Sequence, residues 1–87
     1  MHFTEVGLIL IYNRILKTAA DLKVNETAII KRIDRSHPSY RRLLEIGFTP
    51  GQEITLLNRT LFNDPISFSI RGTIFAIRKE EASHIFI

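Results

Sequence analysis

The sequence predicts an all-β fold, mainly β with one short helix, arranged as a small barrel of about five strands. Residues 66–70 alternate between apolar and polar without a fault, as a strand with one buried face does. Turn signals recur at close spacing, at Pro50-Gly51 and Arg71-Gly72. A chain of 87 residues that is 45% hydrophobic can bury one core, so we expect one barrel domain.

The first predicted strand runs from Thr27 to Ile33, where β-branched residues dominate and the segment ends in charge. Hydroxyl side chains beside a proline follow at Ser36 and Ser39, and they predict the cap of a helix. Apolar residues then recur at helical spacing from Tyr40 onward. Gly47 supplies the left-handed residue that ends such a helix.

A turn at Thr49-Pro50-Gly51 separates the helix from a second predicted strand, Gln52 to Arg59. The loop Leu61–Pro65 follows as a candidate binding tip. The alternating strand Ile66–Ile70 and the Arg71-Gly72 connection then predict a hairpin.

The second strand of this hairpin is predicted at Thr73–Ile77. Arg78–Ala82 is too short for a stable free helix and suits a single turn that redirects the chain. His84–Ile87 closes the sequence as a last strand. Closing these short strands into a barrel would remove exposed sheet edges.

Residues 1–17 form a separable apolar extension. The run Val6–Tyr12 is shorter than the roughly 20 apolar residues that cross a bilayer. An acidic residue, Glu5, precedes it where a secretory signal would place a positive charge. Spacing from Leu8 to Ile15 fits an amphipathic helix, and a poorly ordered extension is the plain alternative. We place the barrel domain at residues 18–87.

The sequence shows neither the arrangement of residues typical of a catalytic site nor a glycine-rich nucleotide-binding loop. It has no cysteine, which excludes disulfides and thiolate sites and fits a cytoplasmic location. The four glycines never cluster as a phosphate-cradling loop requires. Ser36 and His37 are adjacent without an orienting group or an oxyanion donor, so we predict no catalytic residue and no enzyme activity. We also predict no bound cofactor.

The three histidines are scattered along the sequence. The closest pairs of an imidazole with a carboxylate are Asp34 with His37 and Glu80 with His84. Two ligands are too few for a closed metal site. From the sequence we therefore predict no metal site and expect ordinary surface histidines.

Binding to a partner is the class of function that remains after these exclusions. Residues 31–42 carry a net charge of +4, which suits phosphate, an acidic protein surface or simply a solvated face. Arg41 and Arg42 are candidates to pair with a partner's carboxylates, and Ile46 and Phe48 to form an apolar centre. Asp64, in the loop, is a further candidate. In the alternative interpretation Ile46 and Phe48 are core residues, and an exposed strand edge is another route to a partner.

Two segments resemble the ferrous iron transport protein A (FeoA) family: Arg41 through Gly47-Phe48-Thr49-Pro50-Gly51, and Asp64-Pro65-Ile66 through Arg71-Gly72 to Ala82. Ala19–Leu22 leading into Glu26–Ile30 agrees as well, so the resemblance covers roughly residues 18–87. It implies an SH3-like barrel in the cytosol that assists the ferrous iron permease FeoB, whose cytosolic part is a GTPase. Such a protein would lie near the membrane through its partner. The apolar extension before Thr18 departs from the family pattern.

The alternative function is nucleic-acid binding, or a stand-alone relative of the carboxy-terminal domain of DtxR-type metal-dependent repressors, which the same barrel resembles. Single-strand binders place aromatic residues in a basic groove, and within residues 31–42 only Tyr40 is aromatic. We therefore expect no nucleic acid as partner. Homo-oligomer formation is left open.

Overall fold

The computed structural model describes residues 17–60, 62 and 64–87. The predicted amino-terminal helix and residues 61 and 63 of the predicted loop tip lie outside these residues. The elements are, in order, η1 (Ala19–Asp21), β1 (Thr27–Ile29), β2 (Arg32–Ile33), α2 (Tyr40–Ile46), β3 (Glu53–Arg59), β4 (Ile66–Ile70), β5 (Thr73–Ile77), α3 (Lys79–Ala82) and β6 (Ile85–Phe86).

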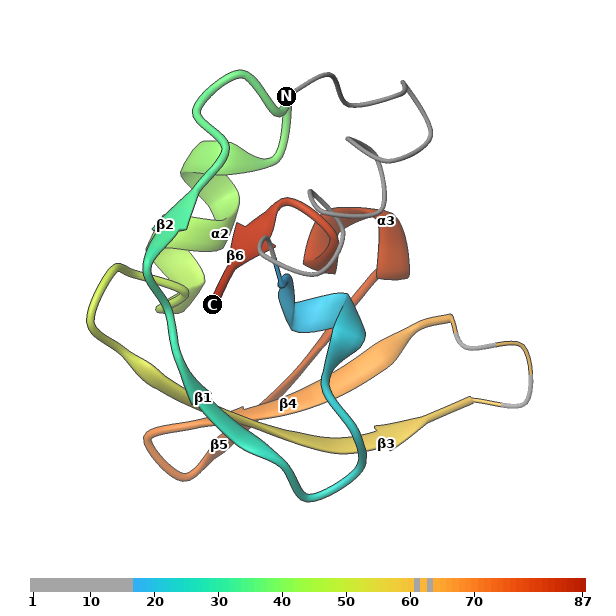
Figure 1. The fold of residues 1–87 in the computed structure, drawn as a ribbon. Helices are drawn as coiled ribbons and strands as arrows, with labels where there is room; N and C mark the ends of the chain where they lie inside the picture. Colours follow the sequence, from blue (N-terminus) through green and yellow to red (C-terminus); the bar gives the residue numbers. More distant parts are fainter. Residues whose placement is uncertain (1–16, 61, 63) are drawn as a thin grey trace, which may run out of the picture.

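The strands form two antiparallel sheets. Four strands are ordered β1-β3-β4-β5, and β2 pairs with β6 in a short second sheet. In Figure 1 the larger sheet lies below, and the short sheet, η1 and both helices lie above it. The mainly β fold class predicted from the sequence is confirmed, with six strands among the described residues instead of about five.

The predicted strand from Thr27 to Ile33 is divided into β1 and β2, which belong to different sheets. The Ile30 N–H donates to the carbonyl of Gln52, beside the larger sheet, and the Lys31 N–H donates to the carbonyl of Phe86 in the other. The chain changes partner between neighbouring residues, and this change joins the two sheets into one barrel.

The predicted helix is confirmed as α2, and Gly47 ends it. Gly47 has φ of +125° and its N–H donates to the carbonyls of Leu43 and Leu44, so the chain leaves the helix in a conformation that favours glycine. The predicted hydroxyl cap is wrong: Ser39 stands at the N-cap and makes no side-chain cap bond. The Ser36 hydroxyl donates instead to Asp34 Oδ1, 2.7 Å away.

The predicted hairpin is confirmed in β4 and β5. Burial alternates along β4 as the sequence predicts, and Ile70 faces Thr73 across the turn. Both turn residues have positive φ, 51° at Arg71 and 79° at Gly72, which matches the twist of a tight hairpin.

The core lies between the larger sheet and the elements above it. Phe48 and Phe68 meet edge to face at its centre, with ring centroids 5.8 Å apart. Aliphatic residues from both sheets and from α2 surround them. Among the described residues, no helix has the length and apolar character needed to cross a membrane.

Candidate functional site

The predicted partner-binding residues of α2 lie on the surface. Arg41 and Arg42 are exposed, and Ile46 at the end of the helix is half-buried. Arg42 donates a hydrogen bond to Glu81 of α3, so its guanidinium is held against the barrel while one side stays accessible. Arg42 and Ile46, four positions apart, lie on one side of this seven-residue helix, and Arg41 lies about a quarter turn further round.

Phe48 cannot belong to that surface in this structure. Its side chain is fully buried, and its ring packs on Phe68 in the core. The glycine stop at Gly47 turns the chain inward and sends the next residue beneath the helix. Of the two interpretations offered by the sequence, the structure places Phe48 in the core.

Asp64 is exposed and has a structural contact of its own. Its Oδ1 accepts a hydrogen bond from the Lys79 N–H at 2.9 Å, at the start of α3. It lines a small hollow with Pro65 and Arg78, and Arg78 also lines the larger depression beside Arg42. The structure therefore connects Asp64 to the α2 surface through Arg78 without bringing it into direct contact.

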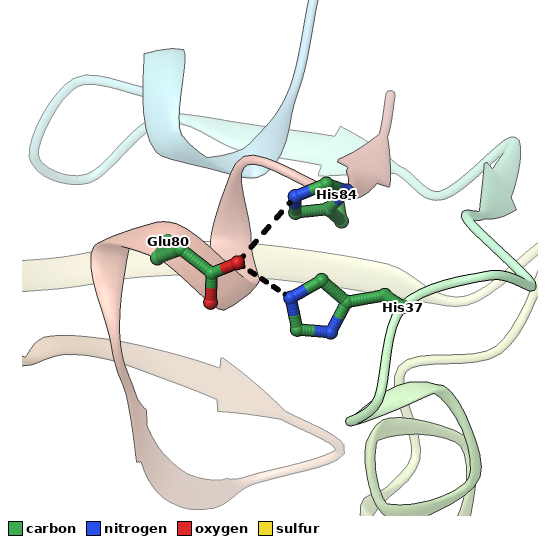
Figure 2. Close-up of side chains that lie close together, drawn as sticks. All are labelled: His37, Glu80 and His84. Carbon is green, nitrogen blue, oxygen red and sulfur yellow. Dashed lines mark hydrogen bonds and ion pairs between the residues drawn. The ribbon is translucent and has the colours of Figure 1, made fainter.

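The larger depression, of about 580 Å³, lies where the loop before α2 meets α3. His37, Glu80 and His84 converge in it, as Figure 2 shows. Two of the three histidines that are scattered along the sequence come together in the fold, because the rings of His37 and His84 have centroids only 4.3 Å apart.

Pairing between β2 and β6 explains this convergence. Ile33 faces Ile85 in the ladder, and the Asp34 N–H donates to the His84 carbonyl one step further along. His84 Nδ1 then lies 3.0 Å from Asp34 Oδ2. The two imidazole–carboxylate pairs noted in the sequence thus become one cluster, because the ladder sets them side by side.

Glu80 lies beside both rings of this cluster and faces the Nε2 atom of each. Its Oε1 is 2.6 Å from His37 Nε2 and 3.6 Å from His84 Nε2.

Hydrogen bonds from the hydroxyl and N–H of Ser36, and then from His84, lower the pKa of Asp34 to about 2. The cluster therefore holds an ionised Asp34 at neutral pH.

Glu81, next along α3, is a buried carboxylate that also lines the depression. Burial alone would raise the pKa of Glu81. Hydrogen bonds from the Arg78 N–H and the Ser39 hydroxyl, and then from Arg42, outweigh burial and lower that pKa to about 2. Glu81 therefore ties α3 to α2 as a charged group.

The basic segment 31–42 is partly engaged within the molecule. The Arg32 guanidinium lies 4.1 Å from the ring centroid of Phe86, and Arg42 pairs with Glu81. Two of the five positive side chains are therefore held by the protein itself, which weakens the segment as an open anion-binding patch.

Sequence reasoning missed the cluster of His37, Glu80 and His84 and the role of Glu81. The available signal was spacing: Asp34 and His37 are three positions apart, and Glu80 and His84 are four positions apart. Joining the pairs required knowing that β2 and β6 are neighbours, and both strands are only two residues long.

Comparison with known proteins identifies the family. The model of the FeoA domain matches residues 17–87. A fused Fe(2+) transport protein A and Fe(2+) transporter FeoB of Porphyromonas gingivalis is 29% identical over 66 residues, which are 76% of this chain. The chain spans only 8% of the length of that fusion protein.

Solved structures share the fold. The FeoA-like protein of Clostridium acetobutylicum matches with a TM-score of 0.76 and 22% identity, over 82% of this chain and 83% of its own. Stenotrophomonas maltophilia FeoA was solved with zinc and is described as an SH3 domain protein. It matches with a TM-score of 0.69 and 26% identity, over 79% of this chain and 86% of its own.

A manganese-dependent transcriptional repressor also matches, with a TM-score of 0.73 and 20% identity over 83% of this chain and 40% of the repressor. At that identity the match shows the fold alone. The family match, by contrast, covers the whole barrel from residue 17 to residue 87. The chain belongs to the FeoA domain family and has its SH3-like barrel fold.

Proposed function

We propose that this chain is a non-catalytic accessory protein of ferrous iron transport that acts in the cytoplasm by binding the cytosolic GTPase part of the ferrous iron permease FeoB. The observation that supports the proposal most directly is the fusion of both components in one Porphyromonas gingivalis protein. Fusion holds two modules at high effective concentration, which is useful where the modules act on one another.

The exposed face of α2 is the surface that we assign to the permease. Arg41 offers an exposed guanidinium group, and the accessible side of Arg42, which already pairs with Glu81, offers further donors; both suit carboxylates on a partner. Ile46 adds a half-buried apolar contact on the same helix. Asp64 borders this surface beyond Arg78 and belongs to its rim.

The proposed action is a shift in the conformational equilibrium of the permease. The chain carries no glycine-rich loop for a nucleotide, so hydrolysis of GTP is assigned to the partner. A binding module changes such an equilibrium only if it binds one state more tightly than another. We therefore expect its affinity to differ between the nucleotide states of the permease.

The test is a titration of the cytosolic part of the cognate permease with this chain, in the apo, GDP and GTP-analogue states. We expect Arg41→Ala to weaken binding about tenfold, the usual effect of removing one charge-assisted contact from an interface. The matched control is Lys23→Ala, which removes an exposed positive charge in the turn between η1 and β1. Absence of binding at micromolar concentration in every nucleotide state would refute the proposal.

Salt dependence separates this function from nucleic-acid binding. Affinity for a nucleic acid would fall steeply as salt rises, because counterions are released from the phosphates. A protein interface with Ile46 near its centre would keep most of its affinity and would weaken when Ile46 is replaced by serine. A steep salt response with no effect of Ile46→Ser would favour the nucleic-acid alternative.

A further inference from the structure

Three possible metal ligands meet at the edge of the barrel, from the loop before α2, from α3 and from the residue before β6 (Figure 2). One ligand atom from each of His37, Glu80 and His84 lies within 4.8 Å of the others. We propose that these three side chains form an open binding site for a divalent transition-metal ion, with Asp34 orienting His84. The proposal does not depend on binding to the permease.

Asp34 fixes the tautomer of His84. An ionised carboxylate only accepts hydrogen bonds, so His84 Nδ1 donates to Asp34 Oδ2 at 3.0 Å. The lone pair of a neutral His84 ring is then on Nε2, 3.6 Å from Glu80 Oε1. A lone pair and a carboxylate oxygen repel one another unless a proton or a cation lies between them. A carboxylate behind a ligating histidine is the usual outer support of a metal site.

His37 is held in the opposite tautomer. The Ser39 N–H donates to His37 Nδ1 at 3.0 Å, so Nε2 carries the proton and donates to Glu80 Oε1 at 2.6 Å. Coordination through Nε2 moves this proton to Nδ1 and breaks the bond from Ser39, while the ring stays neutral. His84 and Glu80 therefore receive the ion first, and His37 completes the ligand set.

The distances between ligand atoms require a small adjustment. Bonds of about 2.0–2.2 Å place two ligand atoms of a tetrahedral ion roughly 3.3 Å apart. The 3.6 Å between His84 Nε2 and Glu80 Oε1 is close to this value, and the 2.6 Å between His37 Nε2 and Glu80 Oε1 must widen. The Glu80 side chain is 65% exposed on a one-turn helix, so it has room to move.

The ligand types select the class of ion. Two imidazoles with one carboxylate suit zinc or ferrous iron, whereas magnesium and calcium prefer oxygen ligands alone. Three protein ligands leave a position for water or for a donor from another molecule. The His37 side chain is only 8% exposed while Glu80 faces solvent, so the ion would lie at the wall of the depression and exchange with solution.

The test is calorimetric titration of the full chain with Zn²⁺, and with Fe²⁺ under anaerobic conditions. We expect one ion per chain with micromolar affinity, and no binding of Mg²⁺ under the same conditions. Glu80→Gln and His84→Ala should each weaken Zn²⁺ binding at least about tenfold, and Asp34→Asn about tenfold as an outer support. Glu45→Gln, at an exposed carboxylate of α2, and His2→Ala are matched controls that should bind as the parent chain does.

Imidazole nitrogen NMR reports which ring nitrogen of each histidine binds the ion and which carries the proton, and calorimetry does not. Zn²⁺ should shift His84 Nε2 and leave Nδ1 in its protonated range, and it should change the tautomer of His37. Equal Zn²⁺ affinity in the parent chain and in Glu80→Gln would overturn the proposal, and Glu80 is exposed enough that this variant should fold. Equal affinity in His37→Ala, or loss of binding only in His2→Ala, would overturn it too. Because the permease is absent from this experiment, its outcome is independent of the proposed function.

Discussion

At the scale of single residues, the buried carboxylate of Glu81 connects two segments that are 39 positions apart in sequence. Its contacts with Arg42, Ser39 and the Arg78 N–H keep it charged in a place where burial favours the neutral form. A carboxylate of this kind makes stability depend on pH, and the direction follows from its lowered pKa.

The folded chain should lose stability in acid because of Glu81. Its pKa is 4.5 in the unfolded chain and about 2 in the folded one, so its contribution is complete above pH 4.5 and is lost as pH falls toward 2. The contribution at neutral pH is at most about 3 kcal/mol. Urea unfolding of the parent chain and of Glu81→Gln between pH 2 and pH 7 should show the difference in unfolding free energy shrinking in acid. Glu45→Gln, at an exposed carboxylate, should follow the parent curve.

The buried ring of Phe48 should contribute strongly to stability. Because its ring is fully buried against Phe68, Phe48→Ala should lower the unfolding free energy by about 3–5 kcal/mol. Arg41→Ala, at an exposed site, should change it by less than about 0.5 kcal/mol. Chemical denaturation measures both. A Phe48→Ala chain as stable as its parent would mean that Phe48 is a surface residue after all.

Among helices and strands, the sequence predicts the ones that are marked by a pattern of neighbouring residues. The helix α2 has its apolar spacing and its glycine stop, and the β4–β5 hairpin has its alternation and its turn residues. The division of residues 27–33 into β1 and β2 has no local signal, because it depends on the carbonyls of Gln52 and Phe86.

The positive φ of Gly47 should make the end of α2 sensitive to substitution. With φ of +125°, any residue with a Cβ is strained there, although the space itself is adequate: a Cβ would lie 3.5 Å from Ile70 Cγ2. Gly47→Ala should therefore cost about 1–3 kcal/mol of stability through backbone strain alone. Thermal unfolding checks this, with Glu45→Ala on the exposed side of α2 as the neutral control. An unchanged melting temperature in Gly47→Ala would contradict the role given to the glycine.

At the scale of the whole molecule, barrel closure creates what the sequence could not show. His37 reaches Glu80 across 43 positions and Asp34 reaches His84 across 50, and both contacts depend on the pairing of β2 with β6. The fold class and family could be predicted because local signals agree along most of the chain. The histidine cluster could not be predicted, because strands of two residues are too short to carry a sequence pattern that indicates which strand they pair with.

We propose that the outer face of α2 is where the barrel binds the permease. The most direct measurement is an NMR titration of this chain, labelled with nitrogen-15, with the cytosolic part of the cognate permease in each nucleotide state. We predict that amide signals of α2, from Arg41 to Ile46, shift or broaden in at least one state while those around Lys23 in the turn before β1 stay in place. Unchanged signals throughout α2 in every state, with the permease folded and in excess, would rule out α2 as the binding surface.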